Sequence, residues 1–143
     1  MKEIFARLYE WFGSIPFYSK DMDDYLRGLD FACTGYFAIP WYLYVGLVMI
    51  IITVLIFALQ NDIIDSRRYK KAGHWGLAAA RIVLFNFFFA AAIPFIALQN
   101  NAYCSRLKLS VADCIGFGVD NALWSLILFV IISQLPRIKA IDR

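Results

Sequence analysis

The sequence predicts an all-α integral membrane protein with three transmembrane helices and an N-terminal amphipathic helix that lies in the membrane interface. Apolar residues make up 62% of the 143 residues and charged residues 17%, whereas soluble domains contain roughly 45–50% and 25%. A soluble fold of this size would expose large apolar patches. The apolar residues also gather in three runs, each near the length of about 20 residues that a helix needs to cross the hydrocarbon core.

The three apolar runs differ in how many polar residues they contain. The first, residues 38–60, is uncharged throughout, and the second, residues 76–98, has only Arg81, near one end. A long basic side chain in that position can reach the headgroups. The third, residues 115–135, contains Asp120, five residues from its start. A carboxylate there lies nearer to the interface than to the bilayer centre, where it would cost about 2.5–3.5 kcal/mol.

The remaining segments are expected to flank or connect these three helices. They are an amphipathic helix (1–20), a polar and acidic connector (21–37), a basic loop (61–75), a loop with two cysteines (99–114) and a basic tail (136–143).

The first twenty residues have a helical pattern of their own. Charged residues occupy one face, Pro16 ends the pattern, and the other face is apolar. That apolar face consists of Ile4, Phe5, Leu8, Trp11, Phe12 and Ile15. Such a helix can lie in the interface, or it can cap the three transmembrane helices or a partner protein. The pattern does not separate these alternatives.

The distribution of basic residues predicts an orientation, because Lys and Arg accumulate in cytoplasmic loops. The first loop and the C-terminal tail are the most basic segments. We therefore expect both on the cytoplasmic side, with the N-terminus and the second loop outside, and a bacterial inner membrane as the default location. The residues expected at the inner leaflet are Arg67, Arg68, Lys70, Lys71 and Arg81.

Each expected transmembrane helix carries one polar residue near its middle, namely Thr53, Asn86 and Ser125. Residues of these types usually hold helices together in lipid, at about 0.6–2 kcal/mol each. The alternative is that they line a pore. We favour packing, because one amide and two hydroxyls are the usual composition of helix contacts.

A second candidate site lies in the outer part of the bundle, where we expect a small polar vestibule. Its expected residues are Pro94, Gly116, Gly118, Asp120 and Asn121. Proline and glycine loosen helices there, and the acid and amide supply polarity. The simpler alternative is that Asp120 faces outer water or pairs with Arg106 or Lys108.

The three cysteines all fall on the expected outer side. Cys104 and Cys114 share one loop, and a disulfide between them would stabilise the chain by about 2–3 kcal/mol in an oxidising compartment. Cys33 would then be left over. The alternative is three reduced thiols.

No combination of residues typical of an active site, a metal site or a cofactor site appears in the sequence, so no enzymatic activity and no cofactor are expected. The net charge of +3 is also too small to suggest nucleic-acid binding. The expected partners are the lipid bilayer and either copies of the chain or other membrane subunits. The predicted function is a helix-packing subunit of an oligomer or larger membrane complex. A homo-oligomeric pore is the alternative, and a membrane thiol-redox protein comes third.

Overall fold

The computed structural model describes residues 2–11, 17–29, 33, 37–64 and 72–141. In these parts the chain is all-helical, with α1 (Lys2–Glu10), α2 (Lys20–Arg27), α3 (Trp41–Ile64), α4 (Ala72–Gln99) and α5 (Val111–Ile141). The last three helices are long and apolar enough to cross a membrane, over Trp41–Leu59, Trp75–Gln99 and Val111–Gln134. The predicted all-helical fold with three such helices is confirmed to this extent.

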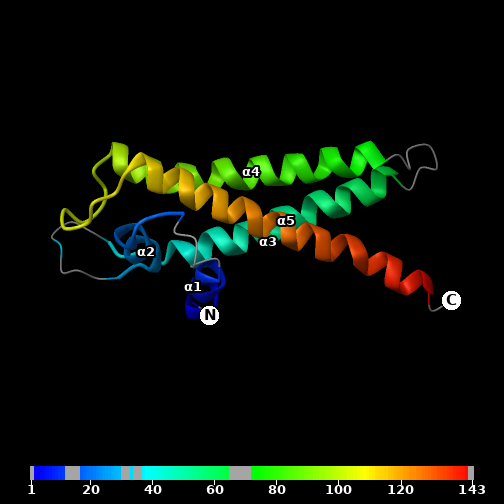
Figure 1. The fold of residues 1–143 in the computed structure, drawn as a ribbon, viewed down its shortest axis with the longest axis horizontal. Coiled ribbons are helices and arrows are strands. Elements are labelled where there is room, and N and C mark those ends of the chain that lie inside the picture. The colour runs from blue at the N-terminus through cyan, green and yellow to red at the C-terminus, as the bar shows by residue number, and fades with distance from the viewer. Residues whose placement is uncertain (1, 12–16, 30–32, 34–36, 65–71, 142–143) are drawn as a thin grey trace.

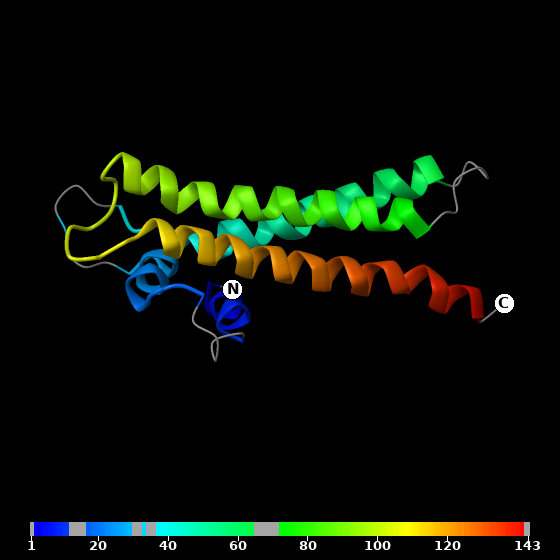
Figure 2. The same cartoon turned by 45° about the horizontal axis from the view of Figure 1, so that its top comes forward.

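The three long helices lie side by side in an elongated bundle, as Figure 1 and Figure 2 show. The most extensive contact is between α4 and α5. One end of the bundle carries α2 and the α4–α5 connection, and we call it the capped end. At the opposite, uncapped end, α3 finishes and α4 begins. Helix α1 packs beside α3 in the half nearer the capped end.

The close contact between α4 and α5 depends on small side chains on α4. Ala79, Asn86, Ala90 and Ala97 are all buried, and their spacing of seven, four and seven residues puts them on one helical face. This face is therefore used within the single chain. The opposite face of α4 is exposed and apolar, with Phe88 as its most exposed phenylalanine.

Helix α2 lies within the segment expected to be a polar connector. Ser19 caps its start and accepts a hydrogen bond from the Met22 backbone N–H, at 3.4 Å. Gly28 ends the helix with φ at 67°, a left-handed conformation that glycine adopts without strain. Met22, Tyr25 and Leu26 form its buried face. The serine before the acidic turn and the glycine after Arg27 are the sequence signals for this helix.

Helix α1 packs against the side of the bundle, on α3. Ala6 and Tyr9 are its buried residues, and Phe5 packs directly on Gly46 of α3. Ile4 and Trp11, both on the expected apolar face, are exposed. Phe12 and Ile15 lie outside the described residues. The buried face is therefore centred one position further along the helix than the apolar pattern indicates.

Candidate functional site

Buried polar side chains concentrate at the capped end, where the N-terminal segment meets α3 and α5. We call this group the polar cluster. It consists of Tyr9, Tyr18, Asp23, Tyr42, Asp120 and Asn121. Its members come from α1, from the residues before α2, from α2 itself, and from α3 and α5, so the cluster forms only when these elements come together.

The first part of the polar cluster is a chain of four oxygen atoms. The Tyr42 hydroxyl donates to Asp23 Oδ1 at 2.6 Å. The hydroxyls of Tyr42 and Tyr18 lie 2.8 Å apart, and the Tyr18 hydroxyl lies 3.4 Å from Asp120 Oδ2. The chain thus runs from a partly buried carboxyl group on α2 to Asp120, which is 1% exposed.

The second part of the polar cluster ties α1 to the contact between α4 and α5. The Tyr9 hydroxyl donates to Asn121 Oδ1 at 2.6 Å, and Asn121 Nδ2 donates to the Asn86 backbone carbonyl at 2.9 Å. Burial raises the pKa of Tyr9 well above its ordinary value. The Tyr9 hydroxyl therefore keeps its proton and always acts as a donor to Asn121.

Aromatic packing holds the hydroxyls in place. The ring of Phe117 contacts those of Tyr9, Tyr18 and Tyr42, with centroid distances of 5.7–6.0 Å. The rings of Tyr9 and Tyr42 stack at 5.1 Å. Such pairs contribute about 0.5–1.5 kcal/mol beyond the area that they bury. The three tyrosines thus share a single apolar support on α5.

Charged residues form the rim of the polar cluster. Arg27 is paired with Glu10 and, through its Nε, with Asp23 Oδ2 at 2.8 Å. Burial raises the pKa of Asp23, and Asp24 also raises it, whereas the Tyr42 hydrogen bond and Lys20 act in the opposite direction. The Asp23 carboxyl group therefore holds a proton more readily than an exposed aspartate does.

Two further carboxylates attach the N-terminal segment to the start of α5. Asp113 Oδ1 accepts from the Ser19 backbone N–H at 2.7 Å, and its Oδ2 accepts from the Ser110 hydroxyl at 2.6 Å. Asp21 Oδ2 accepts from the Lys108 backbone N–H at 3.0 Å. These bonds fix α2 against the end of the bundle.

The three mid-helix polar residues, Thr53, Asn86 and Ser125, are all fully buried. Each donates to a carbonyl of its own helix: Thr53 to Met49 at 2.7 Å, Asn86 to Ile82 at 3.0 Å and Ser125 to Ala122 at 2.8 Å. Within the described chain no hydrogen bond joins the three to one another. The polar contact between Asn86 and α5 is the hydrogen bond from the Asn121 side-chain amide to the Asn86 backbone carbonyl.

The residues expected to form a vestibule lie in close-packed surroundings. A Cβ atom on Gly116 would overlap the Phe17 carbonyl, and one on Gly118 would lie 2.9 Å from the Phe87 carbonyl oxygen. Pro94 is buried within the continuous helix α4. Both glycines therefore allow close packing of α5, at Gly116 against the N-terminal segment and at Gly118 against α4.

Asp120 and Asn121 belong to the polar cluster. At 1% exposure Asp120 does not face water, and its hydrogen-bond partner in the described chain is Tyr18 rather than Arg106 or Lys108. The buried oxygens Asp120 Oδ1 and Asn86 Oδ1 have no hydrogen-bond partner among the described residues.

Of the basic residues expected at the inner leaflet, Arg81 is exposed on α4. Arg67, Arg68, Lys70 and Lys71 lie outside the described residues.

The prediction of a Cys104–Cys114 disulfide is wrong, because Cys104 is bonded to Cys33. The Cα atoms of the bonded pair are 5.7 Å apart, within the range that a disulfide requires. Cys114 is a buried free thiol in the first turn of α5, where its Sγ donates to the Ser110 carbonyl at 3.3 Å. Proximity along the chain favoured the wrong partner, since the fold brings the segment before α3 against the α4–α5 connection.

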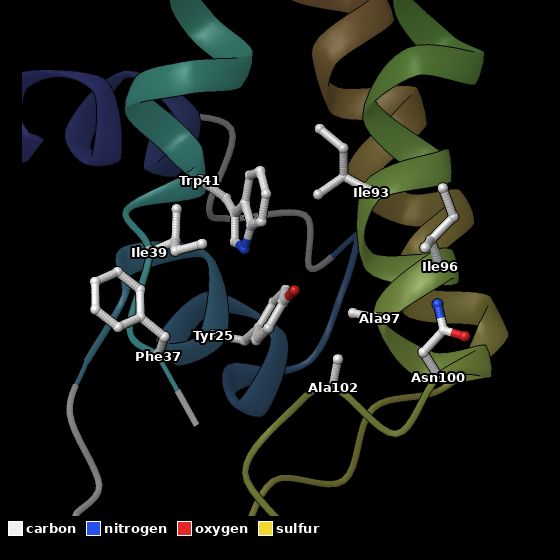
Figure 3. A pocket seen from close by; sticks show the side chains of 9 residues that line it. All are labelled: Tyr25, Phe37, Ile39, Trp41, Ile93, Ile96, Ala97, Asn100 and Ala102. Atoms are coloured by element: carbon white, nitrogen blue, oxygen red, sulfur yellow. The ribbon is translucent and has the colours of Figure 1, made fainter. Parts of the chain in front are cut away.

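A cavity of about 410 Å³ lies at the capped end, between the start of α3 and the end of α4. Figure 3 shows Tyr25 of α2 and Trp41 of α3 on one side of it and Ile93 and Ala97 of α4 on the other. Its lining contains neither a carboxylate nor a basic side chain. The cavity is therefore suited to apolar groups, and it is separate from the chain of hydroxyls.

The described side chains include no group of three or more His, Cys, Asp or Glu residues that could hold a metal ion. What the polar cluster offers chemically is a set of carboxyl and hydroxyl oxygens in hydrogen-bond contact. Sequence reasoning identified Asp120 and Asn121 as candidates but missed Tyr9, Tyr18, Asp23 and Tyr42. Comparisons with family models, curated proteins and solved structures found no match to this chain.

Proposed function

We propose that this chain is an integral membrane protein without enzymatic activity, and that it acts as a helix-packing subunit of a larger membrane assembly. One observation carries the proposal: the polar side chains near the middle of the three long helices are buried inside the chain, and the described surface around them is mostly apolar. In the most apolar stretches of α3, α4 and α5 only 28%, 28% and 44% of the residues are buried. The remaining surface needs lipid or other membrane helices around it.

The exposed side chains support this role. Large apolar residues at least 45% exposed lie along all three long helices, and they include Ile51, Val54, Leu55, Leu84, Phe85, Phe88, Ile96, Ile115 and Ile131. Aromatic residues such as Phe85 and Phe88 can fit between the side chains of a neighbouring helix, because in lipid helices associate mainly through van der Waals packing.

The same geometry supports a subunit role over a homo-oligomeric pore. A pore between copies would need polar residues on the outer surface of each chain. Asn86 and Ser125 are 0% exposed and Asp120 is 1% exposed within a single chain. Each makes a hydrogen bond inside the bundle, as expected for residues that hold helices together.

The disulfide supports an orientation with the capped end outside. Cys104 belongs to the α4–α5 connection at that end and is bonded to Cys33, and disulfides persist in oxidising compartments. This agrees with the basic residues of the first loop and the C-terminal tail, which favour a cytoplasmic position for the uncapped end. We propose a bacterial inner membrane as the location.

The first experiment is to express the protein alone, place it in lipid nanodiscs and determine its mass by native mass spectrometry. A monomer is expected, because the small-residue face of α4 is already occupied by α5. A discrete homo-oligomer would favour a pore, and liposome flux assays on Asn86→Leu would then follow.

Photo-crosslinking in native membranes tests the partner directly. A photoreactive amino acid at the exposed position Phe88 should yield a defined protein adduct. The matched control is the same amino acid at Ile82, which lies on the same helix and is fully buried. Adducts with lipid alone from position 88, and from equivalent exposed positions on α3 and α5, would contradict the subunit role.

A further inference from the structure

The chain of oxygens from Asp23 to Asp120 contains two short contacts and one longer contact but only two hydroxyl hydrogens. The contacts are Asp23–Tyr42 at 2.6 Å, Tyr42–Tyr18 at 2.8 Å and Tyr18–Asp120 at 3.4 Å. A tyrosine hydroxyl supplies one hydrogen, and an ionised carboxylate supplies none. With both carboxylates ionised, one contact would place two oxygens together without a hydrogen between them.

One additional proton completes the chain. If it is on Asp120, Asp120 donates to Tyr18, Tyr18 to Tyr42 and Tyr42 to the Asp23 carboxylate. If it is on Asp23, all three bonds run in the opposite direction. Both arrangements satisfy every contact, and they differ only in which carboxyl group carries the negative charge.

We propose that Asp23 and Asp120 share one proton through the hydroxyls of Tyr42 and Tyr18, so that Asp120 is a buried proton-binding site loaded from the rim of the polar cluster. In the transfer, the O–H bonds of Asp120, Tyr18 and Tyr42 break and new O–H bonds form on Tyr18, Tyr42 and Asp23. The proton count is unchanged, and the negative charge moves from Asp23 to Asp120.

The charged groups around the chain set where the proton rests. Arg27 of α2, which is also paired with Glu10, lies 2.8 Å from Asp23 Oδ2. Arg27 and Lys20 favour a carboxylate at Asp23, whereas Asp24 acts in the opposite direction. Among the described ion pairs none includes Asp120. The titratable neighbour from α1 is Tyr9, and from α3 it is Tyr42, both neutral hydroxyls, while Asn86 of α4 is uncharged. The resting proton is therefore on Asp120.

The rim gives this proton a route to solvent. The Asp23 side chain is 23% exposed, and burial raises its pKa, so it can take up a proton from outside and pass it inward. Tyr18 passes on one proton and receives another in this exchange, and it is neutral before and after the transfer because burial raises its pKa as well. The 3.4 Å contact between Tyr18 and Asp120 is long for a hydrogen bond between oxygens, and it is the expected slow step.

The proposal concerns binding and release of a proton at the capped end. Further along the bundle, the buried hydroxyls of Thr53 and Ser125 each donate to a carbonyl of their own helix, and the cluster of Ala78, Ala79, Ile82 and Phe129 is apolar. Ionisable residues inside membrane-spanning helices commonly mark functional sites. This inference goes beyond the subunit role and holds whether the chain works alone or in an assembly.

The test is infrared spectroscopy of the full-length protein in nanodiscs during a pH titration, which detects the C=O stretch of a protonated carboxyl group. A band that is present at neutral pH and lost in Asp120→Asn is expected. The matched control is Glu3→Gln, which removes an exposed carboxyl group and should leave the band unchanged. Absence of any band that depends on Asp120 at neutral pH would overturn the proposal.

Proton transfer through the hydroxyls of Tyr42 and Tyr18 is tested by a double-mutant comparison. Asp23→Asn should shift the midpoint of the Asp120 band by about one pH unit or more, as for coupled groups. In a Tyr18→Phe background that shift should largely disappear, whereas Tyr44→Phe, at an exposed tyrosine on α3, should preserve it. Tyr42→Phe interrupts the same chain at another point and replaces Tyr18→Phe if that variant does not fold. A shift of equal size with and without the tyrosine hydroxyl would show that the two carboxyl groups do not exchange a proton through it.

Discussion

The two halves of the bundle are held together by different interactions. The half at the capped end combines aromatic stacking, hydrogen bonds between distant residues and the Cys33–Cys104 disulfide. The described core of the other half is a small apolar group of Ala78, Ala79, Ile82 and Phe129, against which Ile56 and Phe57 pack. Directional bonds fix one arrangement of the chain, whereas apolar contacts between helices in lipid accept several. Structural specificity is therefore concentrated at the capped end.

The largest loss of stability is expected at Gly116, where the backbone of α5 lies against the backbone of Phe17 at the capped end. Gly116→Leu should lower the free energy of unfolding by about 3 kcal/mol, because its side chain would displace Phe17 and the residues that follow it. Denaturant titration in mixed micelles measures this. The control is Gly76→Leu, at a position where a Cβ meets nothing within 4 Å. An equal loss in both variants would mean that the N-terminal segment is not seated on Gly116.

Loss of the disulfide should have an effect of similar size. Cys33→Ser should destabilise the protein by about 2–4 kcal/mol, because the bond joins residues 71 positions apart and restricts the unfolded chain. Thermal unfolding with and without reductant checks this, since reductant should affect the wild type and leave Cys33→Ser unchanged. Cys114→Ser should retain the sensitivity to reductant. If Cys114→Ser lost it instead, the pairing in the structure would be refuted.

Removal of the buried Asn121 amide, which links α1 to α4, should have an intermediate effect on stability. Asn121→Ala removes the partner of the Tyr9 hydroxyl and of the Asn86 carbonyl, and leaving such groups unpaired costs about 1–3 kcal/mol. Limited proteolysis should then cut near α1 earlier than in the wild type. Ser133→Ala, which removes an exposed hydroxyl bonded to its own helix, is the control. Unchanged proteolysis in Asn121→Ala would show that α1 is held without this contact.

The smallest loss of stability is expected in the half of the bundle at the uncapped end. Phe129→Leu should cost about 1 kcal/mol, because neighbouring side chains such as Phe57 and Trp75 can adjust to the smaller group. Phe88→Leu, at an exposed position, should be close to neutral. The same micelle titration applies to both. A loss at Phe129 larger than that at Gly116 would reverse the ranking of the two halves.

The sequence predicted the features that depend on neighbours along the chain and missed those that depend on distant ones. The long helices follow from apolar runs, which can be recognised within a window of about 20 residues. Asp120 and Asn121 were identified because a polar residue in such a run is conspicuous. Tyr42 was not, because tyrosine near the end of an apolar helix is common. Tyr18 was not, because its role depends on a contact with Asp120, which lies 102 residues away.

The disulfide was mispredicted for the same reason. The spacing of Cys104 and Cys114 allowed a short loop, and nothing local indicated that Cys33 would reach Cys104 instead. Helix α2 was missed despite Ser19 and Gly28, because its eight residues carry five charges and its buried face is only three residues wide. Short elements of this kind acquire their stability from the bundle that they cap.

The bond between Tyr9 and Asn121 also has a consequence for biosynthesis. These residues are 112 positions apart, and at a synthesis rate of about 5–20 residues per second the second follows the first by roughly 6–22 s. During that interval α1 can already pack on α3, which follows it closely along the chain, but its hydrogen bond to α5 cannot yet form. The Tyr9–Asn121 bond therefore forms only after most of the chain has been synthesised.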